Sequence, residues 1–224
     1  MNKFFSIALL LASVFLYAPF CAAQAETSAW TEGGLKKISV KGLDAVYAKP
    51  GASLAEYNKV LLRPISVSFQ KNWERNVTNG TRMRLTAADS QRIKDKLSAG
   101  VREEVVKQLN DGGYKLVDSA GDDVLDVQMA IVNLYVTAPD VPVPGNVKTY
   151  AVSAGEMTLV LELRDSASGD VIARAFDRAL ANESFRPARI TNADNAAEAR
   201  QAASGWAKAL RTGLDRAKGI GAKP

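Results

Sequence analysis

Apolar and polar residues alternate along residues 124–131, in the middle of the chain. The apolar positions share one face of an extended chain: Leu125, Val127, Met129 and Ile131. Asp126 and Gln128 fall on the opposite face. Because strand side chains alternate between faces, this pattern predicts a central strand over 123–136. Beyond Ile131 the second face also becomes apolar, so either the strand is buried on both faces or a bulge shifts its phase.

Further strand patterns occur on both sides of this central stretch, and the pattern over residues 155–164 is the most regular in the chain. They predict strands over residues 43–47, 60–69, 114–117, 155–164 and 171–181. The second of these contains Pro64, which has no amide hydrogen to donate, so a sheet edge or a bulge is expected there. The last two are joined by a polar hairpin loop over 165–170. Residues 70–85 are polar, with Asn79 and Gly80 as a turn.

Two segments have a helical period instead. After a capping box at Thr86 and Asp89, apolar residues recur every four positions to Leu109, and two glycines follow. The second helix is expected over 191–217, with Asn192 or Asp194 as its cap. These elements predict a two-layer α+β domain. Its mostly antiparallel sheet has about four to six strands, and two long helices pack on one face.

The first 25 residues have the features of a secretory signal peptide. Lys3 precedes an apolar run, and small residues at 23 and 25 predict cleavage between Ala25 and Glu26. A retained N-terminal anchor is the alternative. The remaining chain is divided into an extension or tether over 26–42, a single domain over 43–218 and a flexible tail over 219–224.

Cysteine and histidine usage excludes most standard catalytic designs. Cys21 is the one cysteine, and Pro19 and Phe20 before it make a poor lipidation signal, so lipid anchoring through Cys21 is the less favoured alternative. Cleavage removes Cys21, and the chain has no histidine. Disulfides, thiol nucleophiles and the commonest metal ligand and general base are therefore excluded. We expect no catalytic residue, no metal and no cofactor.

The charge distribution bears on possible partners. The formal net charge of +5 is spread along the chain without a block of like charges. An exported chain of this kind is not expected to bind nucleic acid, whereas peripheral contact with an anionic membrane fits its mild positive charge.

Two sets of residues have some features of catalytic groups. Ser68 and Lys71 have the spacing of a serine nucleophile motif, but Ser68 falls in a predicted strand rather than at a helix start. Carboxylate pairs occur at residues 122–123 and 103–104, in a turn and on a helix exterior. Acid–base catalysis needs two carboxyl groups facing each other across a cleft, which neither placement predicts.

A candidate partner surface follows the central strand. This connection is rich in proline, and its candidate contact residues are Pro139, Val141, Pro142, Val143 and Pro144. Arg174 and Arg178 share one face of a predicted strand and form a candidate basic patch. An ordinary surface loop and a solvated strand face remain the alternatives.

Several short motifs occur in an order that resembles a bacterial family of unknown function, DUF3313, described as lipoproteins of the cell envelope. The matching positions are 49–51, Tyr57, 60–64, Val67, Phe69, Trp73, 123–125, 155–157, 163–165 and Gly169. The resemblance extends from about Leu43 to the last predicted helix and implies an exported bacterial protein. It supplies no catalytic residues, and residues 18–21 depart from the lipidation signal of its anchored members.

Together these features predict a non-catalytic periplasmic protein that binds or supports another envelope component, either a protein, a lipid or a glycan. One alternative is a hydrolase of envelope polymers that uses carboxylates. The other is a lipid-handling accessory subunit of a transport complex, which would have an apolar cavity between the sheet and the helices.

Overall fold

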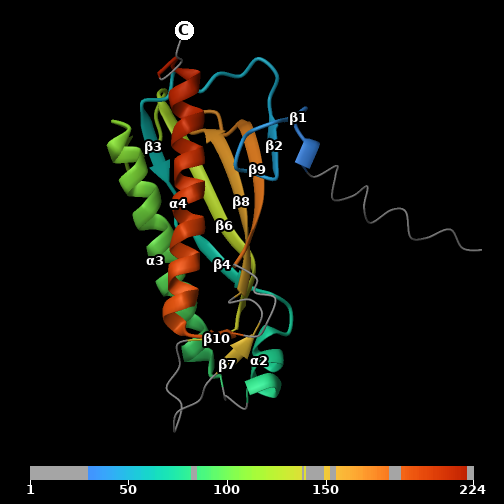
Figure 1. Cartoon of the computed structure of the whole chain (residues 1–224). Helices are drawn as coiled ribbons and strands as arrows, with labels where there is room; N and C mark the ends of the chain where they lie inside the picture. Colours follow the sequence, from blue (N-terminus) through green and yellow to red (C-terminus); the bar gives the residue numbers. More distant parts are fainter. Residues whose placement is uncertain are drawn as a thin grey trace, which may run out of the picture.

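The structure is a computed structural model that describes residues 30–81, 85–137, 139, 149–151, 155–181 and 188–220. The helices α3 (Ala87–Asp111) and α4 (Asn192–Ala217) lie side by side on one face of a twisted sheet, and α2 (Trp73–Thr81) lies at one end (Figure 1). The leader 1–25 lies outside the described residues. No helix in the described part of the chain is both long and apolar enough to span a membrane.

The sheet is mixed and has eight strands, in the order β1-β2-β9-β8-β6-β3-β5, with β4 paired to β6. Its strands are β1 (Lys36–Ile38), β2 (Ala45–Ala48), β3 (Lys59–Leu62), β4 (Ser66–Phe69), β5 (Lys115–Leu116), β6 (Val124–Val136), β8 (Gly155–Asp165) and β9 (Val171–Leu180). A separate antiparallel pair is formed by β7 (Thr149–Ala151) and β10 (Ala188–Ile190).

The predicted α+β class and the two-layer arrangement are therefore confirmed, but the details of the sheet were wrong. Eight strands replace the expected four to six, and three pairings are parallel: β3 with β5, β3 with β6 and β4 with β6. The strand predicted over 60–69 is two strands, separated by Pro64. Because α3 carries the chain back along the helical layer before β5 and β6, β3 and β4 pair in parallel with β6.

A bulge settles the ambiguity in the central strand. β6 lies inside the sheet between β8 and the parallel strands, as expected. At Asn133 the backbone has a φ of 53°, and the ladder to β8 shifts register between Val132 and Tyr135. Asparagine tolerates this left-handed conformation better than most residues. The extra residue moves Leu134 onto the face already occupied by Ile131, and both side chains are buried.

The helix α2 was missed by the sequence patterns, and the turn predicted at Asn79 and Gly80 was wrong, because both residues lie within it. Trp73 and Val77 are its only buried positions among those described, at 1% and 2% exposure. The Trp73 ring stacks on Phe69 at 3.8 Å between centroids. The helix is thus held by two apolar side chains one turn apart in an otherwise polar segment.

Both long helices begin with a capping box. The box predicted at Thr86 and Asp89 is confirmed. In α4 the cap is Thr191 rather than Asn192 or Asp194, and the Asp194 carboxylate accepts a hydrogen bond from the Thr191 backbone N–H. Each helix therefore satisfies its first amide groups with its own side chains.

Candidate functional site

The two arginines of the predicted basic patch lie on the outer face of the sheet, opposite the helices. Arg174 and Arg178 do share this face, but each arginine pairs with a carboxylate of β8. Arg174 contacts Glu162 at 2.6 Å, and Arg178 contacts Glu156. Burial alone would raise the pKa of Glu162, but hydrogen bonds from Arg174 and Arg164 hold that pKa below its ordinary value. The two arginines are thus part of a ladder of ion pairs rather than an uncompensated positive patch.

Glu162 should make the protein sensitive to acid. Because its folded-state pKa is lowered, its contribution to stability is present above its ordinary pKa of 4.5 and is lost as the pH falls through the lower folded-state value. We expect Glu162→Gln to be less stable than the wild type at neutral pH and to lose less stability on acidification. Urea unfolding of both proteins across this pH range measures the effect. Parallel pH profiles would contradict the assignment.

The other candidates from the sequence are dispersed. Pro139 is buried, whereas Val141, Pro142, Val143 and Pro144 lie outside the described residues. Ser68 is in β4 and Lys71 follows that strand, so the geometry of a serine nucleophile at a helix start is absent. In the carboxylate pair at residues 122–123, Asp123 forms an ion pair with Lys59 at 2.9 Å.

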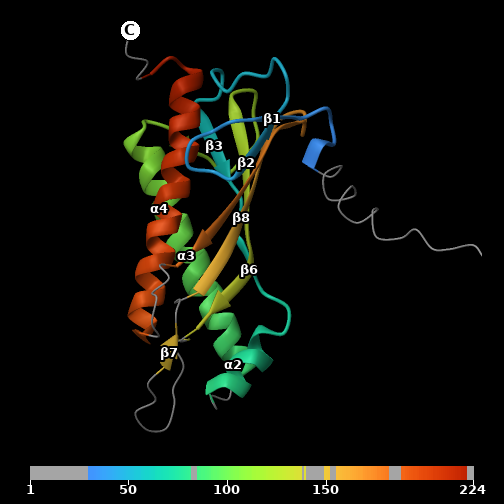
Figure 2. The same ribbon diagram turned by 45° about the vertical axis from the view of Figure 1, so that its right-hand side comes forward.

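A cavity of about 790 Å³ opens between the sheet and the two long helices. It lies toward the end of the molecule where both helices begin, which is the lower end in Figures 1 and 2. Its volume falls in the range typical of small-molecule sites, about 300–1,000 Å³. Most of its wall is apolar and comes from five elements. The main apolar residues are Ile93, Leu97 and Val101 of α3, Leu134 and Val136 of β6, Met157 of β8, Ala179 of β9, and Ala199, Ala202 and Trp206 of α4.

The cavity exists because the parallel helices are tightly packed only in their C-terminal halves. There Val105, Leu109 and Leu214 are fully buried. The Tyr114 hydroxyl after α3 donates to Asp215 of α4 at 2.9 Å, and burial raises its pKa. Toward the N-terminal ends the facing residues are small or only partly buried, as at Leu97 and Ala199, and space is left above the sheet.

Trp206 lines the cavity and belongs to the buried core. Its side chain is 3% exposed, and its indole Nε1 donates a hydrogen bond to the Asp177 carboxylate of β9 at 2.6 Å. This contact joins α4 to the sheet directly beneath the space. Trp206 therefore fixes how far α4 stands from β9, and with it the width of the cavity.

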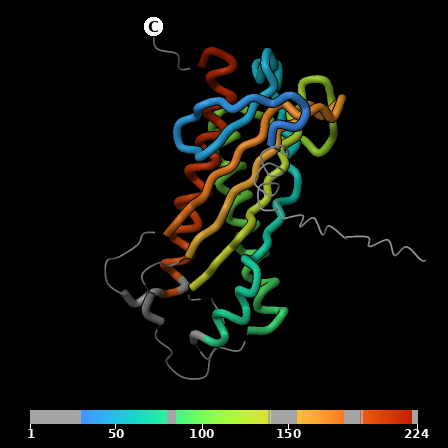
Figure 3. The backbone as a smooth tube through the Cα atoms, turned by 90° about the vertical axis from the view of Figure 1, so that its right-hand side faces the viewer, coloured from blue at the N-terminus to red at the C-terminus, as the bar shows by residue number. Residues whose placement is uncertain are grey.

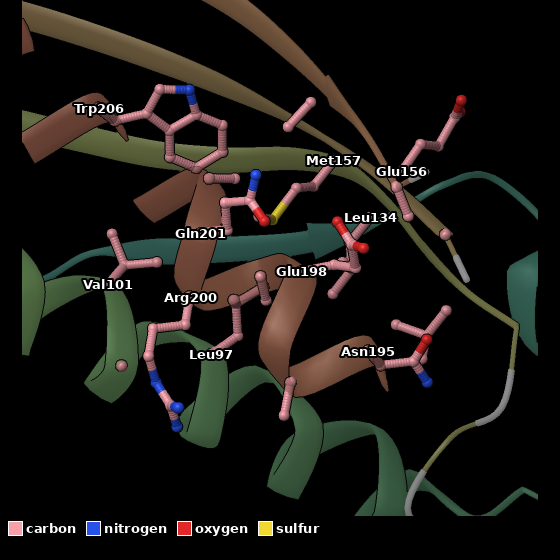
Figure 4. Close-up of a pocket in the computed structure, with 18 of the residues that line it drawn as sticks. Leu97, Val101, Leu134, Glu156, Met157, Asn195, Glu198, Arg200, Gln201 and Trp206 are labelled. Atoms are coloured by element: carbon pink, nitrogen blue, oxygen red, sulfur yellow. The ribbon is translucent and has the colours of Figure 1, made fainter. Parts of the chain in front are cut away.

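Polar side chains also line the cavity. Figure 4 shows Gln201 and Glu198 projecting from α4 toward the sheet, whereas Arg200 points away from it beside α3. Glu156 points out of the cavity, in agreement with its pairing with Arg178. The pair Glu103 and Glu104, considered above for catalysis, lies on the rim contributed by α3. A mostly apolar wall with a few polar side chains suits a ligand that is largely apolar.

Several carboxyl groups outside the cavity are held in their charged form. In the described part of the chain, hydrogen bonds or a cationic partner hold the pKa of four of them below its ordinary value: Asp89, Asp123, Glu162 and Asp165. None of these four lines the cavity. In the described ranges no three or more residues of the metal-binding types lie together as a potential metal site.

An apolar cavity between the sheet and the helices was expected only for the alternative of a lipid-handling subunit, and the residues that line it were not predicted. The alanines of α4 are small, which allows helices and sheets to approach each other closely. The same residues also leave volume where the elements diverge. Ile93 and Leu97 offered a second signal, since they continue the apolar stripe of α3 but are only partly buried.

By its fold and its cavity, the chain is a two-layer α+β protein with an apolar space between the sheet and the two long helices. The chain belongs to the family described as "Protein of unknown function (DUF3313)", whose model matches residues 33–210. No curated protein matches the chain.

Several solved structures are similar in fold. The XCC0632 protein from Xanthomonas campestris, of the family model DUF330, has 14% identity and a TM-score of 0.40, covering 73% of this chain and 86% of that chain. A homolog of a neuraminyllactose-binding hemagglutinin from Helicobacter pylori has 11% identity and a TM-score of 0.41, covering 78% and 91%. A PelC dodecamer from Paraburkholderia phytofirmans has 12% identity and a TM-score of 0.34, covering 71% and 94%. At these scores the similarities carry no argument about function.

Proposed function

We propose that the protein is a non-catalytic component of the bacterial cell envelope that holds the apolar part of another envelope component in the cavity between α3, α4 and the sheet. The observation that carries this proposal is the mostly apolar wall of the cavity of about 790 Å³. Export to the periplasm is part of the proposal and is supported by the leader pattern of residues 1–25.

The side chains of the cavity wall favour some classes of ligand over others. A glycan would need many hydrogen-bonding groups along its length, whereas the inner wall here offers mainly alanine, leucine, valine and methionine side chains. A lipid chain or an apolar peptide segment fits this wall. The hydrolase alternative is less favoured, because Glu156 points out of the cavity and pairs with Arg178 instead of facing a second carboxylate across it.

Filling the cavity should weaken binding of an apolar probe. The test uses dansyl-labelled undecanoic acid, whose fluorescence rises on transfer from water to an apolar site. Ala202 lines the cavity, so we expect Ala202→Phe to bind the probe about tenfold more weakly than the wild type, because the new ring occupies the space.

Ala197 provides the matched control. It lies on the same helix but is exposed and does not line the cavity. Ala197→Phe adds the same ring elsewhere and should bind the probe as the wild type does. Absence of probe binding by the wild type, or equal binding by both variants, would contradict the proposed function.

A further inference from the structure

The cavity between the sheet and the long helices is elongated along the helix axes. Its lining residues on α3 lie between positions 93 and 104, and those on α4 lie between positions 193 and 206. With a rise of about 1.5 Å per residue, these stretches are about 16 Å and about 20 Å long. Figure 3 shows β8 and β9, in orange, in front of α4, in red, so the sheet covers this side of the space. Val105 and Leu210, in the next turn of each helix, are buried in the core and do not line the cavity.

The volume of the cavity limits the thickness of what it can enclose. The volume is about 790 Å³. A helix of about 16 Å in length is at least about 10 Å across with its side chains, and it would need about 1,300 Å³. The cavity is therefore too small to enclose a helical segment of a partner protein, and a chain that runs along its length has to be extended and thin.

The wall presents side chains rather than backbone groups. The floor is one face of the sheet, in which β8 is hydrogen-bonded to β6 on one side and to β9 on the other. In the interior of α3 and α4 the backbone groups bond to each other along the helix. An extended peptide of about 16 Å has about five residues, each with one donor and one acceptor to satisfy. An enclosed peptide would have to find these partners among side chains that are mostly apolar, which makes its burial costly.

An acyl chain does not have this cost, because it has no polar groups along its length. The hydrocarbon core of a bilayer is about 30 Å thick and contains two leaflets, so the chains of a membrane lipid extend over about 15 Å. The lined stretches of α3 and α4 have about this length. Length, thickness and polarity thus all fit the same class of ligand.

We propose that the cavity holds an acyl chain of a membrane lipid, extended along α3 and α4 between these helices and the sheet. This inference rests on the proposed function and names the class of ligand. The chain lies against Leu134, Met157 and Ala179 on the sheet and against the apolar stripes of the two helices.

Gly100 lies about halfway along this path. It continues the row of Ile93 and Leu97 on α3, with the i, i+4, i+7 spacing of one helix face. All three residues line the cavity, and a Cβ at Gly100 would meet no atom within 4 Å. The helix therefore leaves this part of the path open, and a side chain introduced at Gly100 would obstruct it.

The experiment measures the affinity of the full mature chain for lysophosphatidylcholines of increasing chain length. Calorimetric titrations are made below the concentration at which each lipid forms micelles. We expect the affinity to rise about tenfold for each two methylene groups between the decanoyl and the myristoyl lipid, because each added group is buried. The rise should stop beyond the palmitoyl lipid, whose chain fills the lined stretch. An affinity that does not depend on chain length would overturn the inference.

A leucine at position 100 tests the path of the chain. We expect Gly100→Leu to bind the palmitoyl lipid about tenfold more weakly than the wild type. The decanoyl lipid should bind almost as before, because about 10 Å between Ile93 and Gly100 stays open. Leucine favours the helix more than glycine does, so the change should not impair folding. If this variant does not fold, the chain-length series with the wild type still decides the question.

Gly213 provides the matched control. It lies in α4, a Cβ there would also meet no atom within 4 Å, and it does not line the cavity. Gly213→Leu makes the same change in helix propensity and should bind every lipid as the wild type does. Equal binding of the palmitoyl lipid by both variants would refute the proposed path.

The outcomes separate this inference from the proposed function. If dansyl-labelled undecanoic acid binds but no lysophosphatidylcholine does, the membrane lipid is refuted as the ligand, while an apolar ligand in the cavity remains supported. If neither probe binds, the proposed function fails as well. A rise of affinity with chain length that is curtailed in Gly100→Leu and kept in Gly213→Leu supports the acyl chain in the cavity.

Discussion

Replacing Trp206 with alanine is expected to lower the free energy of unfolding by about 3–5 kcal/mol, the range observed when a buried aromatic residue is truncated. The indole is 3% exposed and packs in the main core beside Ala203 and Leu210. Its removal merges the space it fills with the existing cavity, so the surrounding side chains cannot collapse onto each other. Urea unfolding monitored by circular dichroism measures the loss, with the m-value checking that the transition stays two-state.

Trp206→Phe separates the hydrogen bond from the packing. Phenylalanine keeps most of the apolar contact but has no donor for the Asp177 carboxylate. The expected loss is about 1.5–3 kcal/mol, the range for a hydrogen bond to a charged group. Should the alanine variant lose no more than the phenylalanine variant, Trp206 would not be a packed wall of the cavity.

The elements that the sequence predicted well are those in which one pattern persists for several residues. β8 alternates along its length, β6 alternates as far as Ile131, and the capping box at Thr86 marks the start of α3. Such regular patterns arise because one face of each element is buried along its whole length. Elements stabilised by one or two contacts lack this signal, and the prediction failed for them.

The strand pairing depended on information that is not local. Nothing within residues 59–62 states that β3 pairs in parallel with β6, because this choice is made by the path of α3 over the sheet. The bulge at Asn133 was one of two open alternatives, since an apolar second face and a shift of phase give the same sequence pattern.

The position and the lining residues of the cavity could not be predicted for a related reason. A stripe of alanines describes the side chains of one helix, but an empty space is a property of the distance between elements. That distance depends on the hydrogen bond from Trp206 to Asp177 and on the hydrogen bond from Tyr114 to Asp215. The arginines at 174 and 178 were correctly placed on one strand face, but their partners on β8 are not adjacent in sequence.

The same reasoning singles out Trp73, which holds α2, the helix that the sequence patterns missed. Its ring is 1% exposed and stacks on Phe69, and its Nε1 donates to the Val136 carbonyl at 3.0 Å. We expect Trp73→Ala to lower the free energy of unfolding by about 3–5 kcal/mol. Trp73→Phe, which keeps a stacking ring but loses the donor, should cost about 1 kcal/mol.

The loss at Trp73 should also be visible locally. Apart from Trp73, the helix buries only Val77 among its described positions, so Trp73→Ala leaves α2 with a single apolar anchor and its Glu74 contact to Ser90 at 2.6 Å. Amide hydrogen exchange within α2 should therefore become faster than in the C-terminal half of α3, which keeps its buried core. Equal acceleration throughout both helices would show that α2 unfolds only with the whole domain, and that Trp73 stabilises the global core rather than this helix.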